Sequence, residues 1–449
     1  MLTGTPSTRL GPDPDLAQLP SLAPDDLLPW RDELLDATAV VDRARRLGLV
    51  DGPVSGASLV RAKYRIGESL RVAWRLDRTP APPLLISVRS YARGTGPANL
   101  GPAAGPDGRR RGAGDPDWRA GWWVFPHDRR LRLASRLMAA DPGLAGRLGL
   151  NGWLRSEVAE YAPERSLTVR AVGADGAPLG YVKCYAPGTF DTDRLAGRYE
   201  LVNRWFARRP GLTTPEVLGS APDLLALEAL AGTPWADDAA GAADHHLHLM
   251  GQAVAHLHQL PVAATTGLCR PFTRLRADRV AGSAQLVARA RPDVASAVGG
   301  LARRLTARPA AGEVVLLHGD CHPGNTLLGP GPAAISLIDL DQSGIGEPAC
   351  DIASMLARIQ LGALVGEHDR SRATALSEAF LEGYRQRRNL PGPAQIRWYL
   401  AATLLVERAV RAVNRLHAGG LAQLPALVDL ATAVLDGGLF TDRQLERRP

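Results

Sequence analysis

Residues 318–351 contain side chains suited to moving a phosphoryl group from a nucleotide to an alcohol. Asp320 and Asn325 lie on a segment broken by Gly and Pro, and Asp339 follows at the end of the apolar run AAISLI. Phosphoryl transfer needs a carboxylate that orients the attacking hydroxyl, and oxygen ligands for the Mg²⁺ that neutralises the phosphates. Asp320 suits the first task, and Asn325 and Asp339 suit the second.

The motif HGDxHxxN, followed by IDxDxxxxGxPxxDxA, resembles the catalytic and metal-binding loops of the aminoglycoside phosphotransferase and choline kinase-like superfamily, whose members have a protein-kinase-like fold. The resemblance covers roughly residues 155–415. It implies that Asp320 is the catalytic base. It also implies that Asn325 and Asp339 bind Mg²⁺, with Asp341 assisting.

Two further residues of this segment are expected to support the loop. The resemblance implies that Asp351 braces it from the start of a helix, and an N-cap for the run IASMLARI is a role that Asp351 could fill as well. His318 is expected to be structural and to bond to the backbone near the metal loop. Asp320 has a simpler alternative role, closing a turn before Pro323.

Upstream, the run LGYVKCYA predicts a strand that carries Lys183. The resemblance implies that this lysine pairs with the α- and β-phosphates of ATP. A helix is predicted next, because apolar residues recur at helical spacing over residues 195–206. Glu200 on this helix is the candidate ion-pair partner of Lys183, and a solvated helix glutamate is the alternative.

The chain lacks a GxGxxG phosphate loop, so the turn around residues 163–166, which includes Ser166, is predicted to cover the phosphates. A later apolar strand ends near Glu228 and Leu230. The resemblance implies that this is the hinge, where backbone groups contact adenine. ATP, as co-substrate, and Mg²⁺ are implications of the resemblance, and GTP is an open alternative to ATP.

An internal repeat lies upstream of these elements. YRIGESLRVAWRL, from Tyr64, matches YAPERSLTVRAV, from Tyr161, and SVRSYARGT matches YVKCYAPGT with Arg89 in the place of Lys183. We expect residues 50–95 to form a degenerate copy of the N-lobe hairpin, or a cap domain with the same strand pattern. Chance similarity between two β-rich segments is the alternative.

Together these features predict an α+β, protein-kinase-like two-lobed fold with an antiparallel-sheet N-lobe, a mainly helical C-lobe and an extra N-terminal cap-like subdomain. Residues 1–117 are expected to form the cap-like subdomain, with the degenerate hairpin and a flexible linker. Residues 118–230 are expected to form the N-lobe and hinge, and residues 231–449 the helical C-lobe.

Composition narrows the possible partners and location. No apolar stretch is long enough to span a membrane and the N-terminus lacks a signal-peptide pattern, so we expect a cytoplasmic protein without a membrane partner. The 4 cysteines lie far apart, which fits a reducing compartment. The formal net charge is +7, but the basic residues are dispersed, so nucleic-acid binding is not expected. The expected partners are ATP and a small hydroxylated acceptor.

Two other functions are possible from sequence alone. DLDQS after an apolar strand resembles the nucleophile motif of haloacid-dehalogenase-type phosphatases, in which Asp339 would be phosphorylated, but this leaves HGDCHPGN unexplained. A catalytically silent pseudokinase that binds nucleotide is the second alternative, although the base, the asparagine and the metal aspartate are all present. The favoured function is ATP-dependent phosphorylation of a hydroxyl of a sugar, amino sugar, aminoglycoside or similar metabolite.

The charge balance of the C-terminal part bears on the acceptor. Between Gly344 and Leu416 there are ten arginines and seven acidic residues. An aminoglycoside carries several ammonium groups that must be desolvated together, which requires a pocket rich in carboxylates. We therefore expect a neutral or weakly charged acceptor.

Overall fold

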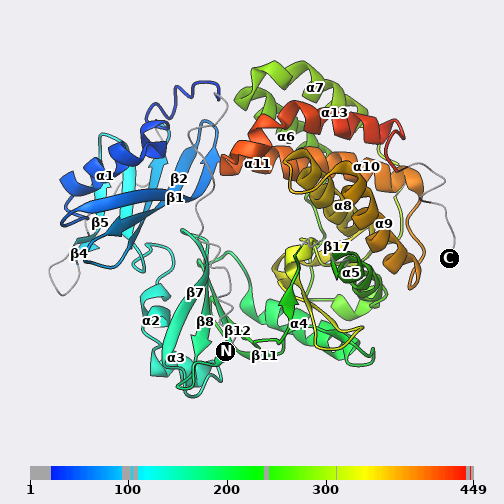
Figure 1. Ribbon diagram of the computed structural model, residues 1–449, viewed down its shortest axis with the longest axis horizontal. Helices are drawn as coiled ribbons and strands as arrows, with labels where there is room; N and C mark the ends of the chain where they lie inside the picture. Colours follow the sequence, from blue (N-terminus) through cyan, green and yellow to red (C-terminus); the bar gives the residue numbers. More distant parts are fainter. Residues whose placement is uncertain are drawn as a thin grey trace. The chain divides into compact units, whose positions relative to one another are not determined.

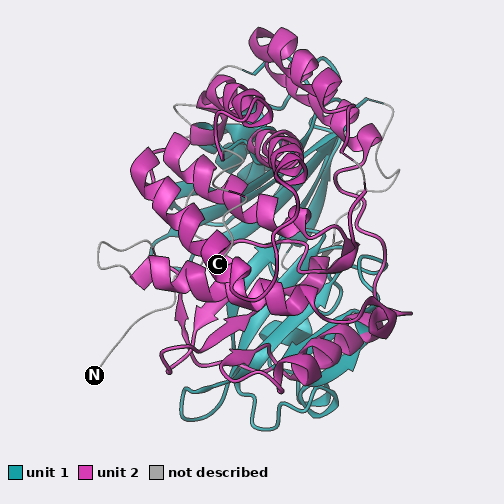
Figure 2. Cartoon of the chain, turned by 90° about the vertical axis from the view of Figure 1, so that its right-hand side faces the viewer, with its two compact units in different colours: residues 1–192, 218–227, 413–418 teal, residues 193–217, 228–412, 419–449 magenta. Residues whose placement is uncertain are grey.

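The computed structural model (Figure 1) describes residues 22–93, 110–236, 242–309, 311–440 and Leu445, and the backbone alone of residues 103–104. The chain forms two compact units (Figure 2). Unit 1 consists of Met1–Thr192, Leu218–Leu227 and Val413–Ala418. Unit 2 consists of Asp193–Val217, Glu228–Ala412 and Gly419–Pro449.

The first part of unit 1 is an antiparallel sheet in the order β1-β2-β3-β6-β5-β4, and helix α1 (Ala37–Arg46) contacts β1. Trp74, Trp122 and Ile86 are buried in its core. The strands are β1 (Val54–Arg65), β2 (Ser69–Arg78), β3 (Leu84–Tyr91), β4 (Ala103–Ala104), β5 (Arg110–Asp115) and β6 (Ala120–Val124).

This sheet extends beyond the part of the chain predicted for it. Its last strand reaches Val124, past the predicted boundary between residues 117 and 118. Part of the predicted flexible linker is strand β5, and two other linker residues form strand β4, of which only the backbone is described. The linker residues 94–102 and 105–109 lie outside the described structure. The Gly-rich sequence of β5 is typical of a loop, but Asp115 at its end is buried, pairs with Arg43 and accepts a hydrogen bond from Trp122 Nε1 at 3.3 Å. These tertiary contacts stabilise a strand where local propensity predicts none.

The second sheet of unit 1 has the order β11-β12-β9-β8-β7. Short helices α2 (Ala134–Met138) and α3 (Pro142–Arg147) belong to the same part of the chain, and Leu137 and Leu144 share one buried cluster with Leu167 and Val182 of the sheet. The strands are β7 (Arg155–Ala162), β8 (Ser166–Val172), β9 (Pro178–Tyr185), β11 (Val217–Ala221) and β12 (Leu224–Leu227).

The two sheets share one hairpin register. Between β2 and β3, Ser69 stands opposite Tyr91 and Arg71 opposite Arg89. Between β8 and β9, Ser166 stands opposite Tyr185 and Thr168 opposite Lys183. The structural positions of Arg89 and Lys183 therefore correspond, as the sequence repeat predicts.

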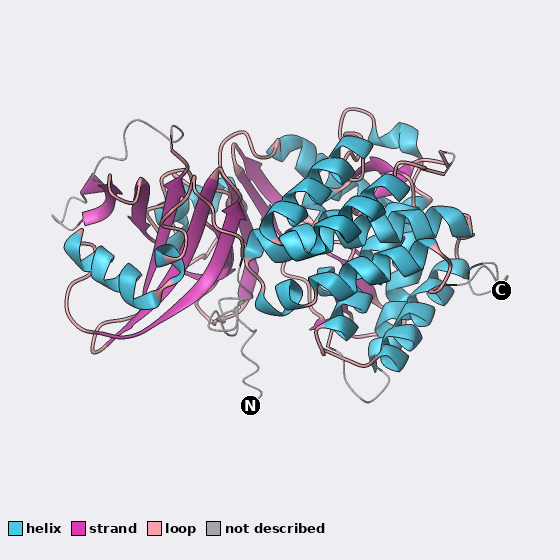
Figure 3. Ribbon diagram, turned by 90° about the horizontal axis from the view of Figure 1, so that it is seen from above, coloured by secondary structure: helices cyan, strands magenta, loops and turns pink. Residues whose placement is uncertain are grey.

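Unit 2 is mainly helical (Figure 3), so antiparallel sheets precede a helical C-terminal region, as predicted. None of the described helices is long and apolar enough to cross a membrane. From residue 192 onward the helices are α4 (Thr192–Phe206), α5 (Ala242–His258), α6 (Ala277–Ala290), α7 (Ala295–Arg304), α8 (Ala349–Leu364), α9 (Arg370–Arg385), α10 (Pro393–Thr403), the π-helical segment Leu404–Ala409, α11 (Val410–Arg415), α12 (Ala418–Ala422) and α13 (Leu424–Leu435). Of these, residues 413–415 of α11 and the first residues of α4 and α12 belong to unit 1.

Two small sheets in unit 2 carry the loops with the predicted catalytic residues. One has the order β10-β16-β15-β13, and the other pairs β14 with β17. The loop after β14 leads to β15, and the loop after β16 leads to β17. Their bounds are β10 (Leu212–Thr213), β13 (Thr233–Pro234), β14 (Val315–Leu317), β15 (Thr326–Leu328), β16 (Ile335–Leu337) and β17 (Gly344–Gly346).

Candidate active site

Asp351, in the first turn of α8, anchors the loop that carries Asp320. Its carboxylate accepts hydrogen bonds from the backbone N–H groups of His318 at 2.7 Å and Gly319 at 2.9 Å, and from His258 Nε2 at 3.1 Å. Burial alone would raise the pKa of Asp351, but the hydrogen bonds from His258 and from the backbone N–H of Gly319 outweigh it and hold the pKa below its usual range. The ionised carboxylate therefore fixes the start of the loop.

His258, at the end of α5, orients Asp351. Its Nδ1 lies 2.9 Å from the hydroxyl of Tyr384 on α9. Burial lowers the pKa of His258, so the ring is neutral at pH 7. A neutral ring that donates to Asp351 through Nε2 must accept the Tyr384 hydroxyl proton at Nδ1. Nothing in the local sequence predicts this role, because Asp351 and Tyr384 lie 93 and 126 positions away from His258.

The asparagine and the aspartate predicted to bind metal meet at Ile338. His318 Nε2 lies 3.0 Å from the carbonyl oxygen of Ile338, in line with its predicted structural role. The Ile338 N–H donates to the carbonyl oxygen of Asn325 at 2.9 Å. Asp339 follows directly, so the backbone of the two loops brings Asn325 and Asp339 together.

The donors present fit a hard cation. The side-chain NH₂ of Asn325 donates to the carbonyl oxygen of Asp320 at 2.9 Å, which leaves the amide oxygen as the end able to contact a cation. Asp339 has a left-handed backbone, with φ 64° and ψ 59°, a conformation that persists in residues other than glycine only where the surroundings impose it. Among the described residues, no group of three or more His, Cys, Asp or Glu side chains could hold a metal alone. An asparagine, carboxylates and phosphate oxygens together would hold Mg²⁺.

Helix α4 holds the loop that follows Asp339. The backbone N–H of Leu340 donates to the hydroxyl of Tyr199 at 3.0 Å, and Arg198 donates to the carbonyl oxygen of Ser343 at 2.8 Å. Gly319 packs against the same loop, since a Cβ at Gly319 would lie 2.1 Å from the carbonyl oxygen of Gln342. Only glycine fits at this position, where φ is also +80°.

Asp320 sits among positive charges. Its carboxylate oxygens lie 3.8 Å from His322 Nε2 and 3.8 Å from a guanidinium nitrogen of Arg411. Its buried Oδ1 has no hydrogen-bond partner among the described residues. Burial alone would raise the pKa of Asp320, but nearby positive charge, that of Arg411 and Arg274 at neutral pH, outweighs it and places the pKa below its usual range. Burial lowers the pKa of His322 to about 4, so this ring is neutral at pH 7. The carboxylate is therefore ionised at pH 7 and has one oxygen open to a hydroxyl donor.

The predicted phosphate-binding residues lie in unit 1. Lys183 is on the central part of its sheet, opposite Thr168 of β8 on one side and Leu225 of β12 on the other. Ser166 is the first residue of β8 and directly follows the turn around residues 163–166. Their contact with phosphates stays a prediction.

The other three predicted cofactor-binding residues lie in unit 2. Glu200 on α4 is about half exposed and lies 3.8 Å from Arg204. Glu228 and Leu230 follow β12, and the N–H of Glu228 donates to the carbonyl oxygen of Glu216 at 2.9 Å. The ion pair between Lys183 and Glu200 and the hinge contacts with adenine also stay predictions.

We predict that Asp351→Ala destabilises the protein by about 3 kcal/mol, because it leaves buried N–H donors of the loop without an acceptor. Since the pKa of Asp351 is depressed in the folded state, its contribution is present at neutral pH and is lost as the pH falls below the ordinary aspartate value. Denaturant unfolding at pH 7 and at acidic pH measures both effects. The control is Asp369→Ala, which removes an exposed cap of α9. Equal losses in the two variants would contradict the anchoring role.

These features define a kinase-like phosphotransferase. The sequence pattern of the family described as "Phosphotransferase enzyme family" matches residues 181–399, which include Lys183 and all of the loop residues. This match confirms the predicted resemblance to that superfamily. The protein is a kinase, a small-molecule phosphotransferase with an alcohol group as acceptor.

Solved structures of other proteins superpose on this chain, and the one with a TM-score of 0.50 supports the fold. A candidate aminoglycoside phosphotransferase from Ralstonia eutropha is 15% identical and superposes with a TM-score of 0.50, covering 66% of this chain and 97% of its own. A macrolide 2′-phosphotransferase from Brachybacterium faecium is 20% identical, with a TM-score of 0.44 over 67% of this chain and 98% of its own. A choline/ethanolamine kinase family protein from Mesorhizobium loti is 18% identical, with a TM-score of 0.42 over 68% and 97%. No curated protein sequence matches the chain significantly.

Proposed function

We propose that the protein transfers the γ-phosphate of ATP to a hydroxyl of a neutral or weakly charged small molecule, such as a sugar, with Mg²⁺ bound. The observation that carries this proposal is the set of hydrogen bonds around Ile338. Its N–H donates to the carbonyl oxygen of Asn325, and its own carbonyl oxygen bonds His318. Asp339 is the next residue, and the Asn325 side chain donates to the carbonyl oxygen of Asp320. A base and two oxygen ligands for a cation on adjoining loops are what phosphoryl transfer requires.

In this reaction the acceptor oxygen forms a bond to the γ-phosphorus, and the bond from that phosphorus to the bridging oxygen of ADP breaks. Asp320 accepts a hydrogen bond from the acceptor hydroxyl and takes its proton as the bond forms. A carboxylate of low pKa is a weak base, so Asp320 acts mainly by orienting the hydroxyl toward a loose transition state. Asn325 and Asp339, with Asp341 assisting, would hold Mg²⁺, which would supply positive charge to neutralise the phosphates.

The nucleotide contacts come from residues outside these loops. Lys183 pairs with the α- and β-phosphates, and Glu200 pairs with Lys183. The turn that ends at Ser166 covers the phosphates, and the backbone around Glu228 and Leu230 contacts the base. The 4 cysteines are all free, which fits the reducing cytoplasm where ATP is available.

A cavity of about 430 Å³ beside the metal loop is our candidate for the acceptor site. Arg270, Arg274 and Arg279 line it together with Gln342 and Ser343, and none of the described lining residues carries a carboxylate. Arg274 donates to Gln342 at 3.4 Å and its charge reaches Asp320. Glu407 pairs with Arg274 at 2.8 Å, which leaves Arg270 and Arg279 as the cationic residues of the lining. A polycation would have to be desolvated against these positive charges, whereas a neutral polyol could accept hydrogen bonds from them.

A competition experiment tests the acceptor class. Neutral sugars and polyamine acceptors such as kanamycin are offered with ATP and Mg²⁺, and kcat/KM is compared. We expect the neutral sugars to be preferred by more than about tenfold, which corresponds to about 1.4 kcal/mol in transition-state binding. A preference for the polyamines would contradict the proposed acceptor class and leave the kinase assignment intact.

A further inference from the structure

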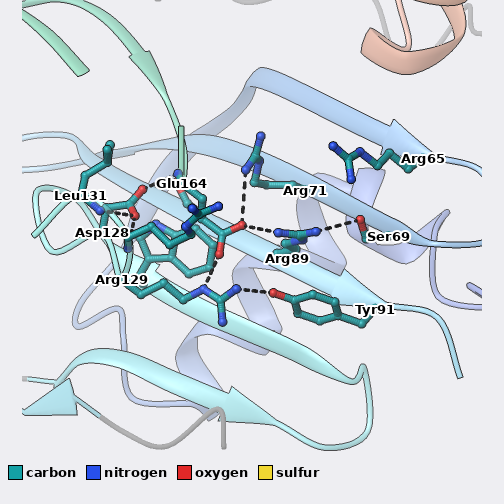
Figure 4. Close-up of polar contacts among 12 residues, drawn as sticks. Arg65, Ser69, Arg71, Arg89, Tyr91, Asp128, Arg129, Leu131 and Glu164 are labelled. Carbon is teal, nitrogen blue, oxygen red and sulfur yellow. Dashed lines mark hydrogen bonds and ion pairs between the residues drawn. The ribbon is translucent and has the colours of Figure 1, made fainter. Parts of the chain in front are cut away.

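Glu164, in the turn between β7 and β8, pairs with three arginines (Figure 4). Its side chain is fully buried. The carboxylate accepts hydrogen bonds from Arg89 at 2.9 Å and Arg71 at 3.3 Å, and it also pairs with Arg129. Arg71 lies on β2, Arg89 on β3, and Arg129 shortly after β6, so all three belong to the N-terminal sheet or the segment that leaves it. We call Arg71, Arg89 and Arg129 the arginine clamp.

The backbone of the same turn has a second anchor. The N–H of Glu164 donates to Asp128 Oδ2 at 2.7 Å, and the hydroxyl of Tyr161 donates to the same oxygen at 2.8 Å. Asp128 is itself fixed, because its Oδ1 accepts the N–H groups of Arg130 at 2.8 Å and Leu131 at 3.2 Å. Glu164 has φ +59°, a conformation that non-glycine residues adopt only when the surroundings impose it. Side chain and backbone thus fix one conformation of the turn.

The charge on Glu164 is maintained despite its burial. Burial alone would raise the pKa of Glu164, but the charges of Arg129 and Arg89 outweigh it and hold the pKa below its usual range. Burying a carboxylate is costly unless it is paired, and a well-packed apolar side chain is often at least as stable in such a place. A buried, ionised carboxylate in this turn therefore favours a role in specifying conformation.

The hairpin register gives the clamp its geometry. Arg71 and Arg89 stand opposite each other in the N-terminal sheet as Thr168 and Lys183 do in the second sheet. Lys183 is the residue proposed to take the α- and β-phosphates of ATP. At the corresponding position of the N-terminal sheet, Arg89 binds the carboxylate of Glu164, which lies in the turn between β7 and β8 of the second sheet. Arg89 also donates to Ser69 at 3.3 Å, which fixes its guanidinium.

We propose that Glu164 is a positioning residue for ATP, and that the arginine clamp holds residues 163–166 in the conformation that covers the phosphates. This inference rests on the proposed function, in which ATP binds at Lys183. A chain without a glycine-rich phosphate loop needs its covering turn held by other contacts, and the N-terminal sheet supplies them. The N-terminal sheet thereby supports the nucleotide site through the turn and makes no contact with the nucleotide itself.

The test compares Glu164→Gln with Glu160→Gln as a matched control. Glu160 lies on strand β7, just before the turn, and also pairs with an N-terminal arginine, Arg61 at 2.9 Å, but its side chain is 53% exposed. Calorimetry gives the Kd for ATP with Mg²⁺, and steady-state kinetics give kcat and the KM values for both substrates. We expect Glu164→Gln to raise the Kd and KM for ATP about 10- to 100-fold, with kcat and the acceptor KM close to wild type. Glu160→Gln should match the wild type.

A second variant keeps the test decisive if Glu164→Gln fails to fold. Arg89→Lys keeps the charge, but lysine lacks the planar guanidinium that donates to Glu164 and Ser69 at once. This variant should also raise the Kd for ATP. Hydrogen exchange over residues 161–167 should be faster in either folded variant. A folded variant with wild-type affinity for ATP would overturn the clamp. A wild-type protein that binds no ATP would instead overturn the proposed function.

Discussion

Asp320→Ala is expected to lower kcat about 10²- to 10⁴-fold, because the variant lacks the carboxylate that orients the acceptor hydroxyl and takes its proton. The fold should persist. The Asp320 side chain makes no hydrogen bond through its buried Oδ1 among the described residues, and its charged neighbours lie no closer than 3.8 Å. Asp351, not Asp320, anchors the loop backbone.

The measurement is kcat at saturating ATP and acceptor, with thermal unfolding as the check on folding. Asp320→Asn is the matched variant, since it keeps the size of the side chain and removes the charge and basicity. Both variants should bind ATP with Mg²⁺ as the wild type does. Near-wild-type kcat in the folded Asp320→Ala variant would show that another group is the base. Absence of turnover in the wild type with every acceptor would favour a pseudokinase.

The elements that the sequence could predict are those encoded by short-range patterns. The run LGYVKCYA predicts a strand and is β9, and the helical spacing over residues 195–206 predicts α4, whose Leu195, Tyr199 and Phe206 are buried. The catalytic motif predicts a segment broken by Gly and Pro, and residues 318–322 are irregular before a 3-10 turn over Pro323–Asn325. In each case neighbouring residues determine the outcome.

Contacts between residues far apart in the chain could not be predicted in this way. The residues of the pair between Glu164 and Arg89 are 75 positions apart, and those of the pair between His258 and Asp351 are 93 positions apart. Neither pair leaves a periodic pattern. The Gly-rich strand β5 is a similar case, because its stability comes from Arg43 and Trp122 and not from its own propensity. The sequence repeat indicates that Arg89 occupies the position of Lys183. It does not indicate that Glu164 is the partner of Arg89.

Asp339→Asn is expected to weaken Mg²⁺-dependent ATP binding and to lower kcat/KM about 10²- to 10³-fold, because it removes the charge that holds a hard cation against the phosphates. The backbone should tolerate the change. Asn adopts the left-handed conformation of Asp339, with φ 64°, as readily as Asp does. The loss should therefore come from the charge and not from misfolding.

ATP titrations with and without Mg²⁺ separate this effect from a general loss of affinity. In the wild type Mg²⁺ should strengthen ATP binding, whereas in Asp339→Asn it should add little. Asp341→Asn is the matched control on the same loop and should show a smaller loss, because Asp341 only assists. Equal dependence on Mg²⁺ in the wild type and Asp339→Asn would contradict the metal assignment. If the wild type instead became labelled on Asp339 by a phosphomonoester without nucleotide, Asp339 would be a nucleophile of the phosphatase type, since a metal ligand of a kinase forms no bond to phosphorus.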